Sequence, residues 1–213
     1  MNKHKKYDAS SIEVLEGLEP VRRRPGMYIG GTDNASMHHL FSEVIDNAMD
    51  EAVANFASFI EVKVETDNTI SIYDNGRGIP IDPHPNFPDK SALEVIMTTL
   101  HAGGKFSNKV YQTSGGLHGV GISVVNALSE FVDVEVYRDK KIYNQKFSKG
   151  HPTSKLKEIK KKTNKKGTKI SFKPDPEIFG ADNNFNCNKL YDFSKSKAYL
   201  FAGVEIRWFC DSE

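Results

Sequence analysis

The chain has 213 residues, of which 38% are hydrophobic, enough to bury one sizeable core, so disorder throughout is excluded. Its 29 basic and 28 acidic residues leave a formal net charge of +1, so no overall charge draws it to nucleic acid or to an anionic membrane. No stretch approaches the roughly 20 apolar residues of a membrane span, and Cys187 and Cys210 lie far apart without metal-binding spacing. We therefore expect a cytoplasmic protein in a reducing compartment, with no membrane contact and no disulfide scaffold.

The first predicted element is a long amphipathic helix over residues 36–56, whose apolar residues recur at helical spacing. Residues 43–51 contain four carboxylates and no base, so these acids repel one another unless a cation or a hydrogen-bonded ligand offsets them. Such oxygen-rich groups suit Mg²⁺, and an ordinary solvated helix face is the alternative. The polar face carries Glu43, Asp46, Asn47 and Asp50, with Glu51 beside them.

A β-hairpin is predicted next, because apolar and polar residues alternate over residues 60–65 and again over 70–72. The loop Asp74–Pro80 follows, and three prolines predict an irregular stretch up to a helix at residues 92–101.

Glycines are concentrated in one segment, since six of the sixteen fall within Gly103–Gly121, directly before a helix predicted over residues 122–129. Glycine permits close approach of the backbone to a ligand, and a helix start presents free N–H groups, so the segment is typical of phosphate binding. Taken alone, such a cluster equally fits a flexible surface loop. A Walker P-loop is excluded because no Lys-Ser or Lys-Thr follows, and no convincing strand leads into a Rossmann fingerprint.

Four further strands are predicted, at residues 132–137, 142–147, 167–172 and 204–209. Nine lysines face a single acid between Lys155 and Lys173, which favours a solvated hairpin loop over a DNA contact. With no repeat and no clear boundary, the chain is predicted to form one α+β domain.

Three motifs in this order resemble the nucleotide-binding motifs of the GHKL ATPases: Glu43-x-x-Asp46-Asn47-x-x-Asp50-Glu51, Asp74-x-Gly76-x-Gly78 and Gly115–Gly121. The resemblance implies the Bergerat ATP-binding fold, a mixed and mostly antiparallel sheet with helices packed on one face, and it implies ATP and Mg²⁺ as cofactors. The superfamily includes gyrase-type topoisomerases, Hsp90 chaperones, MutL repair proteins and histidine kinases.

Longer strings narrow the resemblance to the B subunits of bacterial type IIA topoisomerases, over residues 7 to about 209. Tyr7, the string Ile12–Gly30 and the string His101–Phe106 carry it, and Phe106–Gln112 with Gly121–Ser123 is more similar to topoisomerase IV than to gyrase. The implied protein is an A2B2 enzyme whose B subunits form a homodimer closed by ATP and which passes, relaxes and decatenates DNA.

On this resemblance residues 1–213 form a single amino-terminal ATPase domain, with an arm at residues 1–20 and an ATP lid region at residues 82–121. The transducer and TOPRIM domains are then absent from this chain. Gyrase-type supercoiling is the first alternative, and an Hsp90-like or MutL-like clamp or a histidine kinase is more remote.

The resemblance also implies roles for single residues. Glu43 is the general base that activates water, and His39, one helical turn earlier, orients it. Asn47 is the Mg²⁺ ligand, with Asp46 and Asp50 in support. Asp74 is expected to accept a hydrogen bond from the adenine amino group, with Gly78 leaving room for the base and Thr168 adding a water-mediated contact.

The remaining expected ATP-binding residues border the base or hold the phosphates. Glu51 and Arg77 are expected to pair beside the base. Tyr7 is expected to reach the partner subunit's nucleotide, and Arg138 to border the adenine pocket where competitive inhibitors bind. The apolar wall is Ile79 and Pro80, and the lid residues are Lys105, Gly115, Gly116, Leu117, His118, Gly119, Val120 and Gly121.

Overall fold

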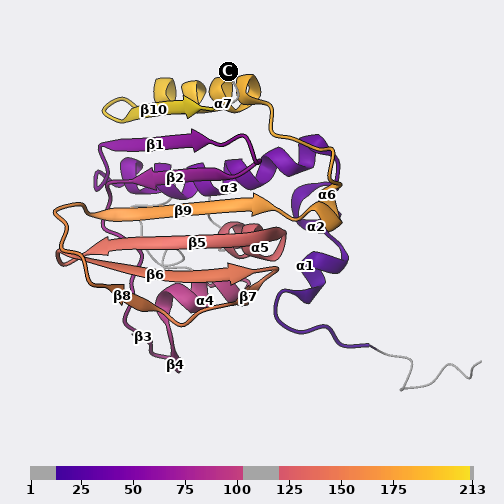
Figure 1. Cartoon of the computed structure of the whole chain (residues 1–213), viewed down its shortest axis with the longest axis horizontal. Helices are drawn as coiled ribbons and strands as arrows, with labels where there is room; N and C mark the ends of the chain where they lie inside the picture. Colours follow the sequence, from indigo (N-terminus) through magenta and orange to yellow (C-terminus); the bar gives the residue numbers. More distant parts are fainter. Residues whose placement is uncertain (1–12, 103–119, 212–213) are drawn as a thin grey trace, which may run out of the picture.

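The computed structural model of the chain describes residues 13–102 and 120–211. Within these residues, eight strands form one mixed sheet (Figure 1): β1 (Phe59–Val64), β2 (Ile70–Asp74), β5 (Ser129–Arg138), β6 (Lys141–Ser148), β7 (His151–Pro152), β8 (Lys157–Ile159), β9 (Gly167–Pro174) and β10 (Glu205–Cys210). The strand order is β10-β1-β2-β9-β5-β6-β7, and β8 also pairs with β6. Of the pairs described, β1 and β10 run parallel and the others antiparallel, which confirms the predicted mixed and mostly antiparallel sheet.

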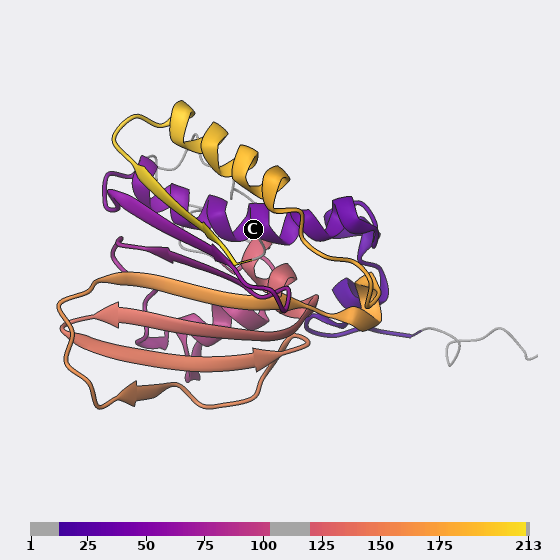
Figure 2. The same ribbon diagram turned by 45° about the horizontal axis from the view of Figure 1, so that its top comes forward.

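Helices cover one face of this sheet, as the GHKL resemblance implies. The described helices are α1 (Glu19–Arg23), α2 (Gly26–Ile29), α3 (Asn34–Val53), α4 (Ala92–Thr98), α5 (Gly121–Ala127), α6 (Pro176–Phe179) and α7 (Cys187–Leu200). Figure 2 shows α3 running along the sheet, and α3 contacts β1, β2 and β9 while α5 contacts β5 and β6. The helix α7 packs on α3 and on the edge strand β10.

The helix α3 begins and ends where its sequence provides local signals. Asp33 caps it, because its carboxylate accepts a hydrogen bond from the Ser36 N–H at 2.8 Å. The helix was predicted to reach residue 56, but it ends at Val53, and Asn55 adopts a positive φ of 62° that terminates the turn. Its buried stripe, which fixes the orientation of the polar face, includes Leu40, Phe41, Val44, Ile45 and Ala48.

The predicted hairpin is confirmed as the antiparallel pair of β1 and β2, and β9 pairs with the other edge of β2. All five residues of β2 are buried, so this strand is central rather than half exposed. The register places Asp74 opposite Thr168, at the ends of their strands. A polar side chain is thereby brought to the last position of a fully buried strand.

One expectation for the fold is wrong, and one helix was not predicted. The stretch after Pro80 is not irregular, because β3 (Pro83–His84) and β4 (Phe87–Ser91) form a separate two-stranded ribbon. Its prolines are tolerated because a two-stranded ribbon leaves outer edges whose N–H groups need no partner strand. The helix α7 was not predicted, since only Leu190 and Ser194 of its residues are buried and its apolar stripe is short. Residues 155–166 of the lysine-rich stretch are mostly exposed, as predicted, although they include the short strand β8, and the rest of the stretch lies in β9.

The cysteines are also not apart in space, although 23 positions separate them in sequence. Cys187, the first residue of α7, and Cys210, the last residue of β10, form a disulfide. After residue 200 the chain reverses direction, and β10 runs back beside α7 (Figure 1). The start of α7 and the end of β10 are thereby brought together. The expectation of no disulfide scaffold is therefore corrected to the extent of this single bond.

Reduction of this disulfide is expected to destabilise the fold. The bond closes a loop of about two dozen residues, and chain entropy alone assigns about 3 kcal/mol of unfolding free energy to such a closure. Urea unfolding with and without a thiol reductant measures the difference, and a Cys187→Ser/Cys210→Ser variant, insensitive to reductant, is the control. A wild-type curve that does not move with reductant would contradict the prediction.

Candidate functional site

The buried carboxylate of Asp74 is the centre of the candidate site. Its side chain lies at the end of β2, and the residue is 4% exposed. Its Oδ1 accepts a hydrogen bond from the Gly76 N–H at 2.8 Å, and the backbone of Thr168 also hydrogen-bonds to the carboxylate. Gly76 is required there, because an added Cβ would lie 2.7 Å from Asp74 Oδ1 and 2.9 Å from Glu51 Oε2.

The surroundings of Asp74 raise the pKa of its carboxyl group to near neutrality. Burial raises the pKa of Asp74 to about 7, and the negative charge of Glu51 acts in the same direction. The backbone hydrogen bonds from Gly76 and Thr168 act against burial and lower the pKa. A carboxyl poised in this way, at the end of a buried strand, is typical of a ligand-binding position.

A ligand that donates a hydrogen bond to the Asp74 carboxylate should bind more tightly as pH rises. Below pH 7 the Asp74 carboxyl of the free protein is protonated, and the ligand can bind only after this proton is released. The affinity should therefore fall by up to tenfold for each unit by which the pH decreases below 7. Adenosine is the probe, because it carries the amino group that the family resemblance implies as the donor and has no phosphate that titrates in this range. Calorimetric titration from pH 5.5 to 8.5 measures the slope, and Asp74→Asn should abolish it; a flat wild-type profile would count against the raised pKa.

Two glycines allow the strands to close around Asp74. Gly78 has a φ of 79°, and an added Cβ would lie 3.1 Å from the Gly167 carbonyl oxygen and 3.2 Å from Val136. Gly167 has a φ of 114°, and an added Cβ would lie 2.8 Å from the Asp74 carbonyl carbon. Both positions therefore require glycine, and side chains there would push β9 away from Asp74.

The loop after β2 is anchored to β9 and to the end of β5. The Ile79 N–H donates to the Thr168 hydroxyl at 3.1 Å, which joins the predicted apolar wall to β9. Ile79 is half-buried and Pro80 is exposed. The Arg138 guanidinium, at the end of β5, donates to the Gly78 carbonyl at 3.5 Å, so this predicted residue also lies at the same loop.

Glu51 and Arg77 form the expected pair. Arg77 Nε donates to Glu51 Oε2 at 3.0 Å and Arg77 Nη2 donates to Glu51 Oε1 at 2.7 Å, so the ion pair is bidentate. The Arg77 N–H also donates to Oε2, and its guanidinium lies 3.8 Å from the centre of the Phe56 ring. The pair thus fixes the loop Asp74–Pro80 to the end of α3.

At the other end of the site, Glu43 lies against the start of α5. A Cβ added to Gly121 would lie 2.9 Å from the Glu43 carboxyl carbon, so only glycine lets the carboxylate approach this backbone. Val120 is the N-cap residue of α5, immediately before Gly121. The structure therefore brings together two predicted motifs that are almost 80 positions apart in sequence.

Cations from outside residues 43–51 offset part of the acidic face of α3, a source that sequence reasoning did not consider. Asp46 Oδ1 lies 2.6 Å from the Lys197 Nζ on α7, and Glu51 pairs with Arg77. Asp50 is buried, with 3% of its surface exposed, rather than solvated. Bases from distant segments thus offset the repulsion, and Asn47, half-buried one turn after Glu43, remains the candidate metal ligand on this face.

The two neighbouring histidines of α3 have different environments. His39 is exposed one turn before Glu43. His38 faces the segment before α7, where its Nε2 accepts from the Asn186 N–H at 3.0 Å, so its Nδ1 donates to the Asn34 carbonyl at 2.6 Å. Burial lowers the pKa of His38, which favours this neutral form.

Some expected site residues lie outside the described residues. These are Tyr7, Lys105, Gly115, Gly116, Leu117, His118 and Gly119. Conversely, Gly167, Phe56 and Lys197 support the site although they were not predicted to. For Gly167, a glycine at the first position of the predicted strand, next to Thr168, was a usable signal. Nothing local marks Phe56 or Lys197, because their contacts depend on tertiary structure.

Two other kinds of feature are absent from the part of the chain that the structure describes. Within residues 13–102 and 120–211, no three or more histidine, cysteine, aspartate or glutamate side chains gather as a metal cluster. None of the helices in these same ranges has the length and apolar character needed to cross a membrane.

Comparison with known proteins agrees with this geometry. A sequence profile described as "Histidine kinase-, DNA gyrase B-, and HSP90-like ATPase" matches residues 32–178. The B subunit of DNA topoisomerase 4 from Rickettsia felis is 63% identical over 209 residues, 97% of this chain and 31% of that protein. The B subunit of DNA gyrase from Thermotoga maritima is 51% identical over 203 residues, 95% of this chain and 31% of that protein.

A solved structure has the same fold. The 43K ATPase domain of Thermus thermophilus gyrase B, crystallised in complex with an aminocoumarin, matches with a TM-score of 0.79 and 42% identity over 91% of this chain and 48% of that chain. The chain spans about a third of the length of the curated relatives that it matches. Because the profile covers more than half of the sequence, this chain belongs to the family of histidine kinase-, DNA gyrase B- and HSP90-like ATPases.

Proposed function

We propose that this chain binds and hydrolyses ATP as the ATPase part of the B subunit of a bacterial type IIA topoisomerase, of the topoisomerase IV kind. The observation that carries the nucleotide assignment is the buried Asp74 carboxylate at the end of β2, close to Thr168 and to the loop that carries Gly78. The higher identity to the topoisomerase 4 relative, 63% against 51% for the gyrase relative, supports the choice between the two.

Base recognition follows from the chemistry of Asp74. An ionised carboxylate accepts a hydrogen bond from the adenine amino group, whereas guanine presents a carbonyl at the corresponding position and cannot donate. Gly78 leaves space for the ring, and Thr168 contributes a water-mediated contact. Ile79 and Pro80 supply apolar contact, while the Glu51–Arg77 pair and Arg138 border the base.

Hydrolysis is assigned to Glu43 as the general base. Its carboxylate would take a proton from the water that attacks the γ-phosphate, and His39 would orient it from the preceding turn. The start of α5, at Val120 and Gly121, presents backbone N–H groups to the phosphates next to that carboxylate.

Mg²⁺ fits the donor groups on α3. The ion prefers oxygen and usually keeps several waters, so one amide oxygen together with substrate phosphates is a sufficient site. Asn47, one turn after Glu43 on α3, would hold it, as the family resemblance implies, while the Asp46 carboxylate is paired with Lys197. When bound, Mg²⁺ neutralises charge that develops on the phosphates.

The same proposal extends to the assembly. We infer a homodimer of B subunits closed by ATP, with Tyr7 reaching the partner's nucleotide, in an A2B2 complex that acts on DNA in the cytoplasm. Competitive inhibitors would bind at the adenine pocket beside Arg138. Residues 1–213 would form the single amino-terminal ATPase domain of that polypeptide.

An assay of the complete polypeptide together with the other subunit of the enzyme tests the assignment. ATP-dependent decatenation of linked DNA circles is expected. ATP-dependent negative supercoiling would instead assign the chain to gyrase. Gyrase is the second candidate because the chain is similar to the Thermus gyrase structure. ATP hydrolysis without either activity would indicate a clamp of the Hsp90 or MutL kind, and phosphate transfer to a partner histidine would indicate a kinase.

A further inference from the structure

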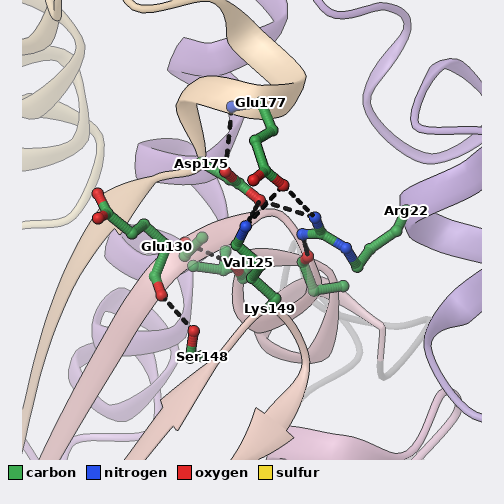
Figure 3. A network of polar contacts seen from close by, with 9 residues as sticks. Arg22, Val125, Glu130, Ser148, Lys149, Asp175 and Glu177 are labelled. Carbon is green, nitrogen blue, oxygen red and sulfur yellow. Dashed lines mark hydrogen bonds and ion pairs between the residues drawn. The ribbon is translucent and has the colours of Figure 1, made fainter.

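The guanidinium of Arg22, on α1, joins segments that are distant in sequence (Figure 3). Its Nη1 donates to the carbonyl of Ala127, the last residue of α5, at 2.7 Å. Its Nη2 donates to Asp175 Oδ2 at 2.7 Å, and the Asp175 side chain is 1% exposed. The ion pair is therefore shielded from solvent on its acidic side, where a charge-assisted hydrogen bond is stronger than at the surface.

This junction satisfies the carboxyl end of α5. A helix leaves its last carbonyls without partners inside the helix, and these carry partial negative charge. Here the Ala127 carbonyl is bound by Arg22, the Leu128 carbonyl accepts from the Asp175 N–H at 3.0 Å, and the Val125 carbonyl accepts from the Ser129 hydroxyl at 2.7 Å. Arg22 is the cation among these groups, and its positive charge complements the partial negative charge of the helix end.

The orientation of Arg22 is itself fixed by neighbouring charges. Lys149 Nζ lies 2.6 Å from Glu177 Oε2 and 3.7 Å from Asp175 Oδ2, so it shares both carboxylates with Arg22. Asp175 Oδ1 accepts from the Glu177 N–H at 3.1 Å and caps α6. Since both oxygens of Asp175 are held, the guanidinium has a defined partner geometry (Figure 3).

The helix α5 links this junction to the candidate catalytic carboxylate. Residues 122–127 are all buried, and Asn126 Nδ2 donates to the Met97 carbonyl of α4 at 2.8 Å. Seven residues of α-helix span about 10 Å, and Gly121 at the far end lies against Glu43. A shift of the end held by Arg22 therefore moves the backbone that contacts Glu43.

We propose that Arg22 is a positioning residue for ATP hydrolysis: it fixes α5 along its axis and so sets the spacing between Gly121 and the Glu43 carboxylate. The proposal rests on the proposed function, since it takes Glu43 as the base. The polar contacts that place Arg22 are with Ala127, Asp175 and Glu177, at the end of α5 away from Glu43. Its loss should therefore impair the chemical step and leave base recognition intact.

The test compares Arg22→Lys and Arg22→Met in the complete protein. Lysine keeps the charge, but its single nitrogen does not reproduce the two-nitrogen fork that serves Ala127 and Asp175 together. A displacement of about 1 Å can cost about 100-fold in rate, so we expect kcat to fall at least about tenfold in Arg22→Lys and further in Arg22→Met. The KM for ATP and the affinity for adenosine should change by less than about twofold, a split that general loosening of the fold would not produce.

Two variants of the same helix serve as controls. Arg23 forms exposed pairs with Glu13 and Glu19, both at 2.8 Å, so Arg23→Met removes an arginine without touching α5. Val21 is fully buried, so Val21→Ala weakens the packing of α1 but retains the guanidinium. Both controls should keep the wild-type kcat at a temperature well below their unfolding midpoints.

The outcomes separate this proposal from the proposed function. If the wild type hydrolyses ATP and Arg22→Lys keeps kcat within about twofold, the positioning role of Arg22 is wrong. If Val21→Ala loses as much kcat as Arg22→Lys, the effect comes from α1 in general and the proposal is also wrong. A wild-type protein that does not hydrolyse ATP overturns the proposed function, and this proposal with it.

Discussion

Glu43→Ala is expected to abolish ATP hydrolysis while ATP binding stays measurable. The variant removes the carboxylate that lies against Gly121 but leaves Asp74, Thr168 and the loop after β2 unchanged. General base catalysis contributes about 10²- to 10⁴-fold, so kcat should fall by at least about two orders of magnitude. Steady-state phosphate release and calorimetric ATP titration on the complete protein measure the two quantities.

Asp46→Asn is a suitable comparison for Glu43→Ala. It removes a carboxylate from the same face of α3, one whose ion pair with Lys197 points to α7 rather than to α5. It should lose some stability and keep a kcat within a few-fold of the wild type. Near-normal turnover in Glu43→Ala would remove Glu43 as the base.

Asp74→Asn is expected to weaken adenosine binding by about 10- to 100-fold, because hydrogen bonds to charged groups contribute about 1.5–3 kcal/mol each. The carboxylate receives backbone hydrogen bonds from Gly76 and Thr168, so it must offer acceptors only. An asparagine has one acceptor oxygen and one NH₂ donor, and the donor would face a backbone N–H or the adenine amino group.

The control for Asp74→Asn lies in the same hairpin. Asp67 Oδ1 accepts from the Thr69 N–H at 3.0 Å in the β1–β2 turn, and asparagine supports that turn equally well. Asp67→Asn should therefore bind adenosine as the wild type does. Wild-type affinity in Asp74→Asn, measured at about pH 8 where Asp74 is ionised, would exclude Asp74 as the adenine acceptor.

The sequence predicts those parts of the fold that depend on local pattern. The apolar repeat of α3 and the alternation of apolar and polar residues in β1 each identify an element from its own sequence alone. The pairing of Glu51 with Arg77 was expected from the family resemblance instead. The helix α7 was missed because it is largely polar, and only Leu190 and Ser194 of its residues are buried.

Tertiary contacts account for what sequence reasoning could not reach at the site. The carboxylates of α3 look unpaired in sequence because the partner of Asp46 is about 150 positions away on α7. The contact between Glu43 and Gly121, and the raised pKa of Asp74, likewise depend on how α3, α5 and β2 pack. A one-dimensional pattern contains the residue types but not these distances.

Because β2 is central in the sheet, Asp74 is held in place before a nucleotide binds. The strand is hydrogen-bonded on both edges and buried along its whole length, so displacing Asp74 requires the sheet itself to open. Amide hydrogens of β2 should accordingly be among the slowest to exchange in the chain. A carboxylate at the end of a central, buried strand is in place before the ligand binds, so little of the binding free energy is spent on ordering it.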